Sequence, residues 1–337
     1  MDKRGARYES GQMITVFGGS GFLGRHVVSA LAKRAYRVRV AVRRPDLTQH
    51  LQPLGVVGQI HAVQANLRYP DSITHALRGA DAVINLVGIL QETGRQTFSA
   101  VQTRGAASVA EAAKAAGIPL VHVSALGADP NSESRYGRTK AEAEARVFAA
   151  VPEAVVIRPS ILFGPGDSFF TRFAALARAL PVLPLAGADT RFQPAYAGDV
   201  GEAIARAIDG AVPGGRVYEL GGPEIYTFRE LVQYVLAVTE RRRVVVGLPE
   251  GIARLQATVL EIADKLTLGL LPDELVLTRD QVIMLRTDNV VSQAAIDEGR
   301  TFQGLGITPT AVEAIVPAYL KRFRKHGQFE RQRDLTA

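Results

Sequence analysis

The chain has 337 residues, a formal net charge of +7 and no cysteine. The lack of cysteine excludes disulfides, thiol nucleophiles and cysteine-ligated metal clusters. No stretch reaches the roughly 18 uninterrupted apolar residues of a membrane span, and the polar first dozen residues lack the apolar core of a secretory signal.

The first predicted elements are a strand over residues 13–17, which form an apolar run, and an amphipathic helix over residues 22–33. Three glycines lie around their junction: Gly18, Gly21 and Gly24. This spacing is typical of a dinucleotide-binding unit, in which one glycine permits a tight turn, one admits the pyrophosphate and one packs helix against strand. The helix N-terminus then offers unpaired N–H groups to phosphates.

The second predicted strand covers residues 36–42 and ends at Arg43 and Arg44. A site that selects NAD places an acidic residue here to bind the ribose 2′-hydroxyl, whereas arginine accommodates a 2′-phosphate. The first acid is Asp46, beyond the strand end. Both arginines could simply be solvated, but their position favours phosphate recognition and NADPH over NAD.

Further predicted strands alternate with two helices over residues 98–116 and 136–150. The strands are expected at residues 60–64, 82–87, 120–124 and 155–158. This order predicts an α/β fold, a Rossmann-type doubly wound parallel sheet, with a smaller mixed C-terminal lobe. Ligands of such folds bind at the carboxyl edge of the sheet, where Gly88 and the segment after Ser124 follow their strands.

Proline and glycine become denser after about residue 160, and the predicted helices are shorter. They cover residues 169–180, 200–208, 228–239, 251–266 and 312–323. The helix over 251–266 has a broad apolar face that suits either core packing or docking. We expect a disordered segment at 1–12, an NAD(P)-binding domain at 13–160, an interleaved C-terminal lobe at 161–326 and a flexible tail at 327–337.

Three residues could carry chemistry. Ser124 closes the fifth strand, and Tyr136 and Lys140 lie four residues apart on one helix face, so that the ammonium could lower the pKa of the phenol. A tyrosine tuned in this way, beside a serine that holds a carbonyl, can pass a proton during hydride transfer. His122 is expected to be a core histidine. The six histidines form no pair at metal spacing, so we predict no metal site.

Basic residues are concentrated in two clusters, at 241–243 and 321–325. No aromatic-rich strand of an RNA-binding domain accompanies them. We therefore expect a solvated or partner-facing surface and no nucleic-acid binding.

Over nearly the whole stretch from Met13 to Ile307, the chain resembles the atypical and extended short-chain dehydrogenase/reductase superfamily. Within that superfamily it is most similar to the nucleotide-binding accessory subunits of respiratory complex I, the alpha-subcomplex subunit nine family, in a bacterial form. The resemblance to the superfamily rests on the glycine turn at 18–24, on Tyr136 with Lys140, and on the sequence segments 158–166, 196–200 and 218–222. The resemblance to the complex I accessory subunits rests on the sequence segments 42–45, 85–90, 134–142, 190–194, 278–282 and 288–292.

The resemblance implies a tightly held, structural NADPH and assigns residues to it. Those lining the phosphates are Gly18, Ser20, Gly21, Phe22 and Leu23, with Arg43 reading the 2′-phosphate. Asn66 stands near the adenine, where many relatives have aspartate, and Leu86 and Val87 flank the nicotinamide ribose. Ser124, Tyr136 and Lys140 surround the nicotinamide, which Pro159 and Ile161 cover.

The resemblance also implies the other complex I subunits as partners, anionic lipid headgroups as a contact, and no transmembrane segment. It implies a peripheral position on the cytoplasmic face of a bacterial inner membrane, or on the matrix side in a eukaryote. The short interval between Ser124 and Tyr136 departs from many extended enzymes and argues against a roomy substrate cleft.

Three hypotheses follow. The first is a non-catalytic NADPH-binding accessory subunit of complex I, in which Ser124, Tyr136 and Lys140 only position the cofactor. The second is a soluble NADP-dependent reductase, epimerase or dehydratase that uses these residues in catalysis. The third is a redox-sensing regulator. The fold is compatible with all three.

Overall fold

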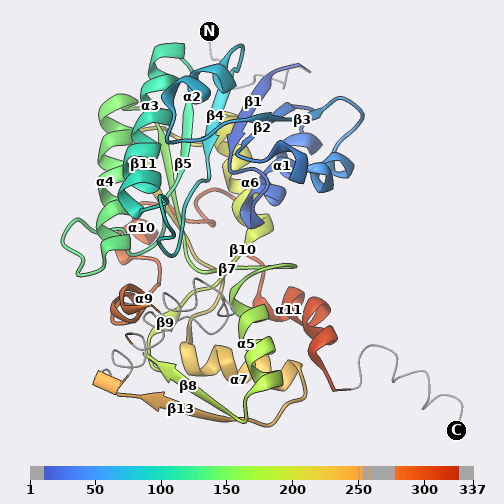
Figure 1. Cartoon of the computed structure of the whole chain (residues 1–337), viewed down its shortest axis with the longest axis vertical. Coiled ribbons are helices and arrows are strands. Elements are labelled where there is room, and N and C mark those ends of the chain that lie inside the picture. The colour runs from blue at the N-terminus through green and yellow to red at the C-terminus, as the bar shows by residue number, and fades with distance from the viewer. Residues whose placement is uncertain (1–10, 250, 253–257, 259–277, 326–337) are drawn as a thin grey trace, which may run out of the picture. The chain divides into compact units, whose positions relative to one another are not determined.

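The computed structural model describes residues 11–249, 251–252, 258 and 278–325, which group into two compact units (Figure 1). The first unit contains the described residues up to 159, together with 197–220 and 291–308. The second contains 160–196, the described residues between 221 and 290, and 309–325. The expected terminal segments lie wholly or almost wholly outside the described residues, and so does most of the helix predicted over 251–266.

The first unit is built on a seven-stranded parallel sheet in the order β11-β6-β5-β4-β1-β2-β3. Its strands are β1 (Met13–Phe17), β2 (Arg37–Val42), β3 (Ile60–Gln64), β4 (Ala82–Asn85), β5 (Leu120–Val123), β6 (Val155–Pro159) and β11 (Arg216–Leu220). The predicted Rossmann-type fold class is therefore confirmed. The order of the strands reverses at β1, because β2 and β3 lie on one side of it and β4 and the later strands on the other. Sheets of this kind bind their ligands between the two strands at this switch point, here β1 and β4.

Two groups of helices cover this sheet (Figure 1). Helix α1 packs on α6, and α3 packs on both α2 and α4. Their bounds are α1 (Phe22–Lys33), α2 (Pro70–Leu77), α3 (Arg104–Ala116), α4 (Arg135–Ala150) and α6 (Ala197–Ile208). Shorter pieces are the 3₁₀ turns η1 (Pro45–Leu47) and η2 (Gln49–Leu54), the π-helical turn η3 (Ser99–Thr103) and helix α10 (Gln293–Asp297). Apolar residues of α2, α3 and α4 form one core with Phe17, Val83 and Val156 of the sheet.

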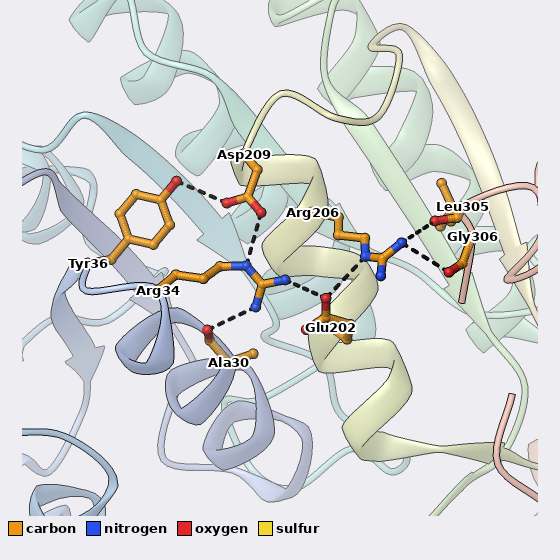
Figure 2. A network of polar contacts seen from close by, with 8 residues as sticks. All are labelled: Ala30, Arg34, Tyr36, Glu202, Arg206, Asp209, Leu305 and Gly306. Carbon is orange, nitrogen blue, oxygen red and sulfur yellow. Dashed lines mark hydrogen bonds and ion pairs between the residues drawn. The ribbon is translucent and has the colours of Figure 1, made fainter. Parts of the chain in front are cut away.

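Within this unit, a polar network joins the end of α1 to residues 202–209 and 305–306, which come much later in the sequence (Figure 2). The Arg34 guanidinium, at the end of α1, donates to Asp209 at 3.0 Å and also to Glu202 of α6. Glu202 in turn accepts from Arg206 at 3.1 Å, and Arg206 donates to the backbone carbonyls of residues 305 and 306 at 2.6 and 3.2 Å. Two arginines thus tie three separate stretches of sequence together.

The second unit is smaller and is held by aromatic packing. Phe163, Phe169, Phe170, Phe192 and Phe228 form a chain of ring contacts with centroids 5.2–6.3 Å apart. Its helices are α5 (Phe169–Ala179), α7 (Phe228–Val238), α9 (Arg279–Met284) and α11 (Val312–Leu320), which η4 (Lys321–Phe323) follows. Its paired strands are β7 (Leu162–Phe163) with β10 (Ala195–Tyr196), β8 (Val182–Ala186) with β13 (Val244–Leu248), and β9 (Arg191–Phe192) with β12 (Tyr226–Thr227).

Candidate functional site

The glycine turn between β1 and α1 has room for backbone only. Gly18 has a φ of +78°, a conformation that costs side-chain-bearing residues energy. A Cβ atom at Gly24 would lie 2.4 Å from the carbonyl oxygen of Gly19, so that any side chain here would push α1 away from the turn. The N–H of Gly21 closes the turn on the Gly18 carbonyl at 3.1 Å.

The N-terminus of α1 is open to an anion. Gly21 is its N-cap, no side chain caps it, and no acidic residue lies in its first turn. Ser20, Phe22 and Leu23 surround this terminus and are half-buried. Unpaired N–H groups and the positive end of the helix dipole therefore meet at this point, as a pyrophosphate requires.

The two arginines after β2 have different partners. Arg44 forms a two-pronged ion pair with Asp46, at 3.0 and 2.7 Å, and both side chains are exposed. Among the described residues, Arg43 makes a single hydrogen bond, from Nη1 to Oε1 of Gln96 at 2.6 Å. A guanidinium has five N–H donors, so Arg43 keeps donors that could bind a phosphate. The guanidinium of Arg44, in contrast, already binds both oxygens of the Asp46 carboxylate.

The strand ends beside the turn carry the next predicted residues. The methyl groups of Val87 lie against Gly18, where an added Cβ would be 3.2 Å from Cγ2. The Leu86 N–H donates to the Phe17 carbonyl at 3.0 Å, which keeps both residues at the end of β1. Asn66 uses its side-chain oxygen to accept from the Arg68 N–H at 3.1 Å. Its carbonyl accepts from Ser72 at 3.0 Å, so local turn bonds fix its position after β3.

Lys140 gathers the residues predicted at the nicotinamide end. Its buried Nζ donates to the Val123 carbonyl at 3.3 Å, directly beside Ser124, and lies 5.8 Å from the centroid of the Tyr136 ring. A Cβ atom at Gly88 would be 3.3 Å from this nitrogen, so glycine leaves space for the amine. The Ser124 hydroxyl is buried and has no hydrogen-bond partner among the described residues, which leaves it available to a ligand.

The expected lowering of the Tyr136 pKa by Lys140 is wrong. Burial raises the pKa of Tyr136 to about 12 and lowers the pKa of Lys140 to about 8, although Glu144 acts in the opposite direction on the lysine. The Lys140 ammonium lies over the ring of Tyr136, 5.8 Å from its centroid. Desolvation therefore outweighs attraction, and Tyr136 stays protonated.

An asparagine–histidine pair lies beneath Lys140 and was not predicted as a unit. Asn85 Oδ1 accepts from the Val87 N–H at 3.1 Å, and its amide nitrogen lies 3.2 Å from Nδ1 of His122. The pair is buried, which confirms the prediction of a core histidine at position 122. Burial and the charge of Lys140 lower the pKa of His122 to about 3, so the imidazole is neutral.

This neutral histidine predicts acid sensitivity. The unfolded chain takes up a proton near pH 6.5 while folded His122 does not, so stability should fall as the pH drops from 6.5 toward 3, by up to about 1.4 kcal/mol per pH unit. His122→Gln should flatten this slope in urea unfolding at pH 7, 6 and 5. His50→Gln, at an exposed site, is the control. Parallel pH profiles of wild type and His122→Gln would contradict the assignment.

The last two predicted cofactor residues lie in different units. Pro159 ends β6, and its carbonyl accepts from the Leu126 N–H at 3.0 Å. Ile161 belongs to the second unit, where its carbonyl accepts from Ala195 at 2.9 Å and its N–H donates to Asn289 at 3.1 Å. A role for Ile161 at the nicotinamide stays a prediction.

The residues of the first unit fit a dinucleotide. The glycine turn excludes side chains, the α1 terminus has no competing cap, and a buried serine hydroxyl lacks a partner. Together they would hold the phosphates and the nicotinamide end, and the bound cofactor would supply hydride chemistry. In the described part of the chain, no group of three or more metal-ligating side chains comes together, and no helix is long and apolar enough to cross a membrane.

Comparison with known proteins supports this interpretation. A model of the NAD dependent epimerase/dehydratase family matches residues 14–221. Alpha subcomplex subunit 9 of mitochondrial NADH dehydrogenase [ubiquinone] 1 from Arabidopsis thaliana is 35% identical over 323 residues, which cover 94% of this chain and 79% of that protein. A ceramide reductase from Caulobacter vibrioides is 35% identical over 179 residues, which cover 53% of this chain and 55% of that protein.

The fold also has close counterparts among solved structures. The NADPH-dependent quinone oxidoreductase QOR2 of Escherichia coli, complexed with NADPH, superposes with a TM-score of 0.69 at 23% identity. The match covers 91% of this chain and 99% of that chain. At this identity, the likeness extends to the fold alone.

Proposed function

The chain belongs to the NAD dependent epimerase/dehydratase family and, within it, to the family of complex I alpha subcomplex subunit 9, and we propose on this basis that it is a non-catalytic, NADPH-holding accessory subunit of respiratory complex I. The observation that carries the proposal is the 35% identity to the Arabidopsis subunit across 94% of this chain. The nucleotide would stabilise the folded chain by mass action and so support assembly of the complex.

The state of Tyr136 favours a structural cofactor. Its side chain is only 9% exposed, and its pKa of about 12 makes proton release at neutral pH costly. A general acid–base works best with a pKa near the operating pH. Lys140 and Ser124 would then hold the nicotinamide end in place without turnover.

The proposed partners are the other subunits of the complex and anionic lipid headgroups. In the second unit, burial and then the nearby charges of Arg243 and Arg178 lower the pKa of Arg241, so these three arginines lie close together. On the β8–β13 pair, Val182 and Val244 are 44% and 60% exposed. A basic and apolar surface of this kind suits a peripheral position on a membrane, either the cytoplasmic face of a bacterial inner membrane or the matrix side in a eukaryote.

The decisive experiment is a native gel of gently solubilised membranes, stained for NADH dehydrogenase activity and blotted for this chain. Migration with the large active band supports the accessory role. Recovery of the chain only in the soluble fraction, at its own size, would overturn it.

Arg43→Ala should weaken NADPH binding by about tenfold to a hundredfold and leave NADH binding nearly unchanged, because a charge-assisted bond to the 2′-phosphate is lost. Arg44→Ala is the matched control, since Asp46 already occupies that guanidinium. Titration calorimetry with both nucleotides measures the difference. Equal losses for NADPH and NADH in Arg43→Ala would refute selection by Arg43.

A second candidate function is a soluble NADP-dependent reductase, epimerase or dehydratase. It is favoured by the retained Ser124, Tyr136 and Lys140, and by the partial match to a ceramide reductase. The third hypothesis, a redox-sensing regulator, has no observation of its own.

Tyr136→Phe separates the two candidates. In an accessory subunit it should leave bound NADPH, assembly of the complex and respiratory activity within about twofold of wild type, because the phenol moves no proton there. In an enzyme it should abolish turnover while the fold survives. Assays of NADH:quinone activity and of nucleotide content in purified membranes measure both outcomes. Loss of respiratory activity with intact assembly would count against the structural role.

A further inference from the structure

We propose that residues 88–98, which follow β4, form a retention loop that slows release of the nucleotide, with Gln96 and Glu92 as its positioning residues. The inference rests on the proposed function, because it requires NADPH to bind at the glycine turn.

One end of the retention loop is fixed at Arg43. Gln96 Oε1 accepts from Arg43 Nη1 at 2.6 Å. Gln96 is presented by a tight turn, because it exchanges two backbone hydrogen bonds with Thr93, at 3.0 and 3.1 Å, across Gly94 at a φ of +55°. The glutamine therefore restricts the rotamers of Arg43 and holds the remaining donors of the guanidinium ready for a 2′-phosphate.

The sheet order shows what the retention loop crosses. It leaves β4 and reaches Arg43 beyond β2, and β1 lies between these two strands. Neighbouring strands are about 4.8 Å apart, so the loop spans two strand spacings, or about 10 Å, at the carboxyl edge of the sheet. The glycine turn follows β1 at this edge, and a dinucleotide bound there would lie under the loop.

The other end of the retention loop is fixed at the start of α4. The Glu92 carboxylate accepts from Arg135 at 2.9 and 3.2 Å, and its Oε1 also accepts from the Phe98 N–H at 2.8 Å. The Phe98 ring meets the Tyr136 ring edge-on, with centroids 5.9 Å apart. Glu92 thus holds the loop against the helix that carries the nicotinamide-end residues.

A buried glutamine anchors the base of the loop. Gln102 is 2% exposed, donates to the Ile89 carbonyl at 2.7 Å and accepts from Thr139 of α4 at 2.8 Å. Since the base is anchored, opening must break the contacts at Gln96 and Glu92. Both contacts include a charged group, and hydrogen bonds to charged groups are the stronger ones.

The test measures NADPH binding kinetics in the full chain by nicotinamide fluorescence, using displacement for dissociation. The variants are Gln96→Ala and Glu92→Gln, with controls at exposed positions, Gln303→Ala and Glu111→Gln. Each variant should raise the dissociation rate constant by about tenfold, and the double variant should raise it further. Glu92→Gln should raise the association rate constant as well, because opening admits the nucleotide. Gln96→Ala should also reduce the preference for NADPH over NADH.

If Gln96 and Glu92 only stabilise the fold, a different result is expected. The variants would then lower the melting temperature of the nucleotide-free protein and leave the rate constants of NADPH binding unchanged, and that result would overturn the inference. Dissociation rates within twofold of wild type in both variants would also overturn it. If the wild-type chain binds no NADPH, the proposed function fails instead, so the two failures are distinguishable.

Discussion

Replacing Gly24 with alanine is expected to destabilise the protein by about 4 kcal/mol and to abolish measurable NADPH binding. The added Cβ would lie 2.4 Å from the carbonyl oxygen of Gly19 and 2.6 Å from that of Gly18. Both atoms are backbone, so no rotamer change can relieve the clash. Helix α1 would have to move away from the turn, and its N–H groups would move with it.

Ser29→Ala is the matched control for this prediction, because Ser29 is half-buried on the same helix and its substitution adds no atom. Thermal unfolding and NADPH fluorescence titration give the two readouts. A Gly24→Ala protein with wild-type melting temperature and affinity would mean that the turn does not need close approach of helix and strand.

The second large effect is expected at Glu144. Its carboxylate accepts two hydrogen bonds from Arg158, at 2.9 and 2.6 Å, and its side chain is only 7% exposed. Arg158 has a second, longer contact to Glu219 at 3.5 Å. Glu144→Gln should therefore cost about 3 kcal/mol, because the half-buried Arg158 guanidinium loses its main counter-charge.

A control on the same helix makes this prediction sharp. Glu142 pairs with Arg146 at 2.8 Å, but both side chains are about half exposed, and Glu142→Gln should cost less than about 0.5 kcal/mol. Urea unfolding at pH 7 measures both variants. Adding Arg158→Met to Glu144→Gln should recover most of the loss. Equal losses at 142 and 144 would show that burial of the pair contributes nothing.

Glu144 also links this ion pair to the candidate site. Tyr136, Lys140 and Glu144 are spaced four residues apart, on one face of α4. Glu144 raises the pKa of the buried Lys140, against the effect of burial. Losing its charge should lower that pKa further and leave the amine neutral over more of the physiological range.

The positions of the glycines and the periodicity of the apolar residues predicted most helices and strands of the first unit. The predicted helix over 22–33 and strand over 60–64 have the bounds observed for α1 and β3. β4 ends two residues before its predicted end because the Asn85 side chain accepts the Val87 N–H and turns the chain. The predicted helix over 98–116 begins with a π-helical turn before α3, next to the buried Gln102.

Other elements had weak or no local signals. Helix α2 was not predicted, although Pro70 at its first position, followed by Asp71, is a helix-start signal. The two-residue strands β7, β9, β10 and β12 are defined only by partners distant in sequence. Such pairing depends on tertiary contacts, which periodicity does not report.

The site shows the same limit. Arg43, Tyr136 and Lys140 stood out because their spacing matches known chemistry. The contact between Arg43 and Gln96 joins residues that are 53 positions apart in the sequence, and no motif or periodicity in the sequence predicts it. The error on the Tyr136 pKa has a related cause: spacing predicts that two groups are neighbours, but the sign of a pKa shift depends on how deeply they are buried.

The sheet edge and the network of Figure 2 are both completed late during synthesis on the ribosome. The sheet cannot gain its edge strand β11 until residues 216–220 have emerged. Arg206 meets its carbonyl partners only when residues 305 and 306 follow. The edge of β6 therefore stays unpaired until about two-thirds of the given sequence has been made, and the contacts of Arg206 form only after about nine-tenths of it. Such exposed edges attract chaperones and aggregation partners, so NADPH captured by the finished unit would mark the end of this vulnerable interval.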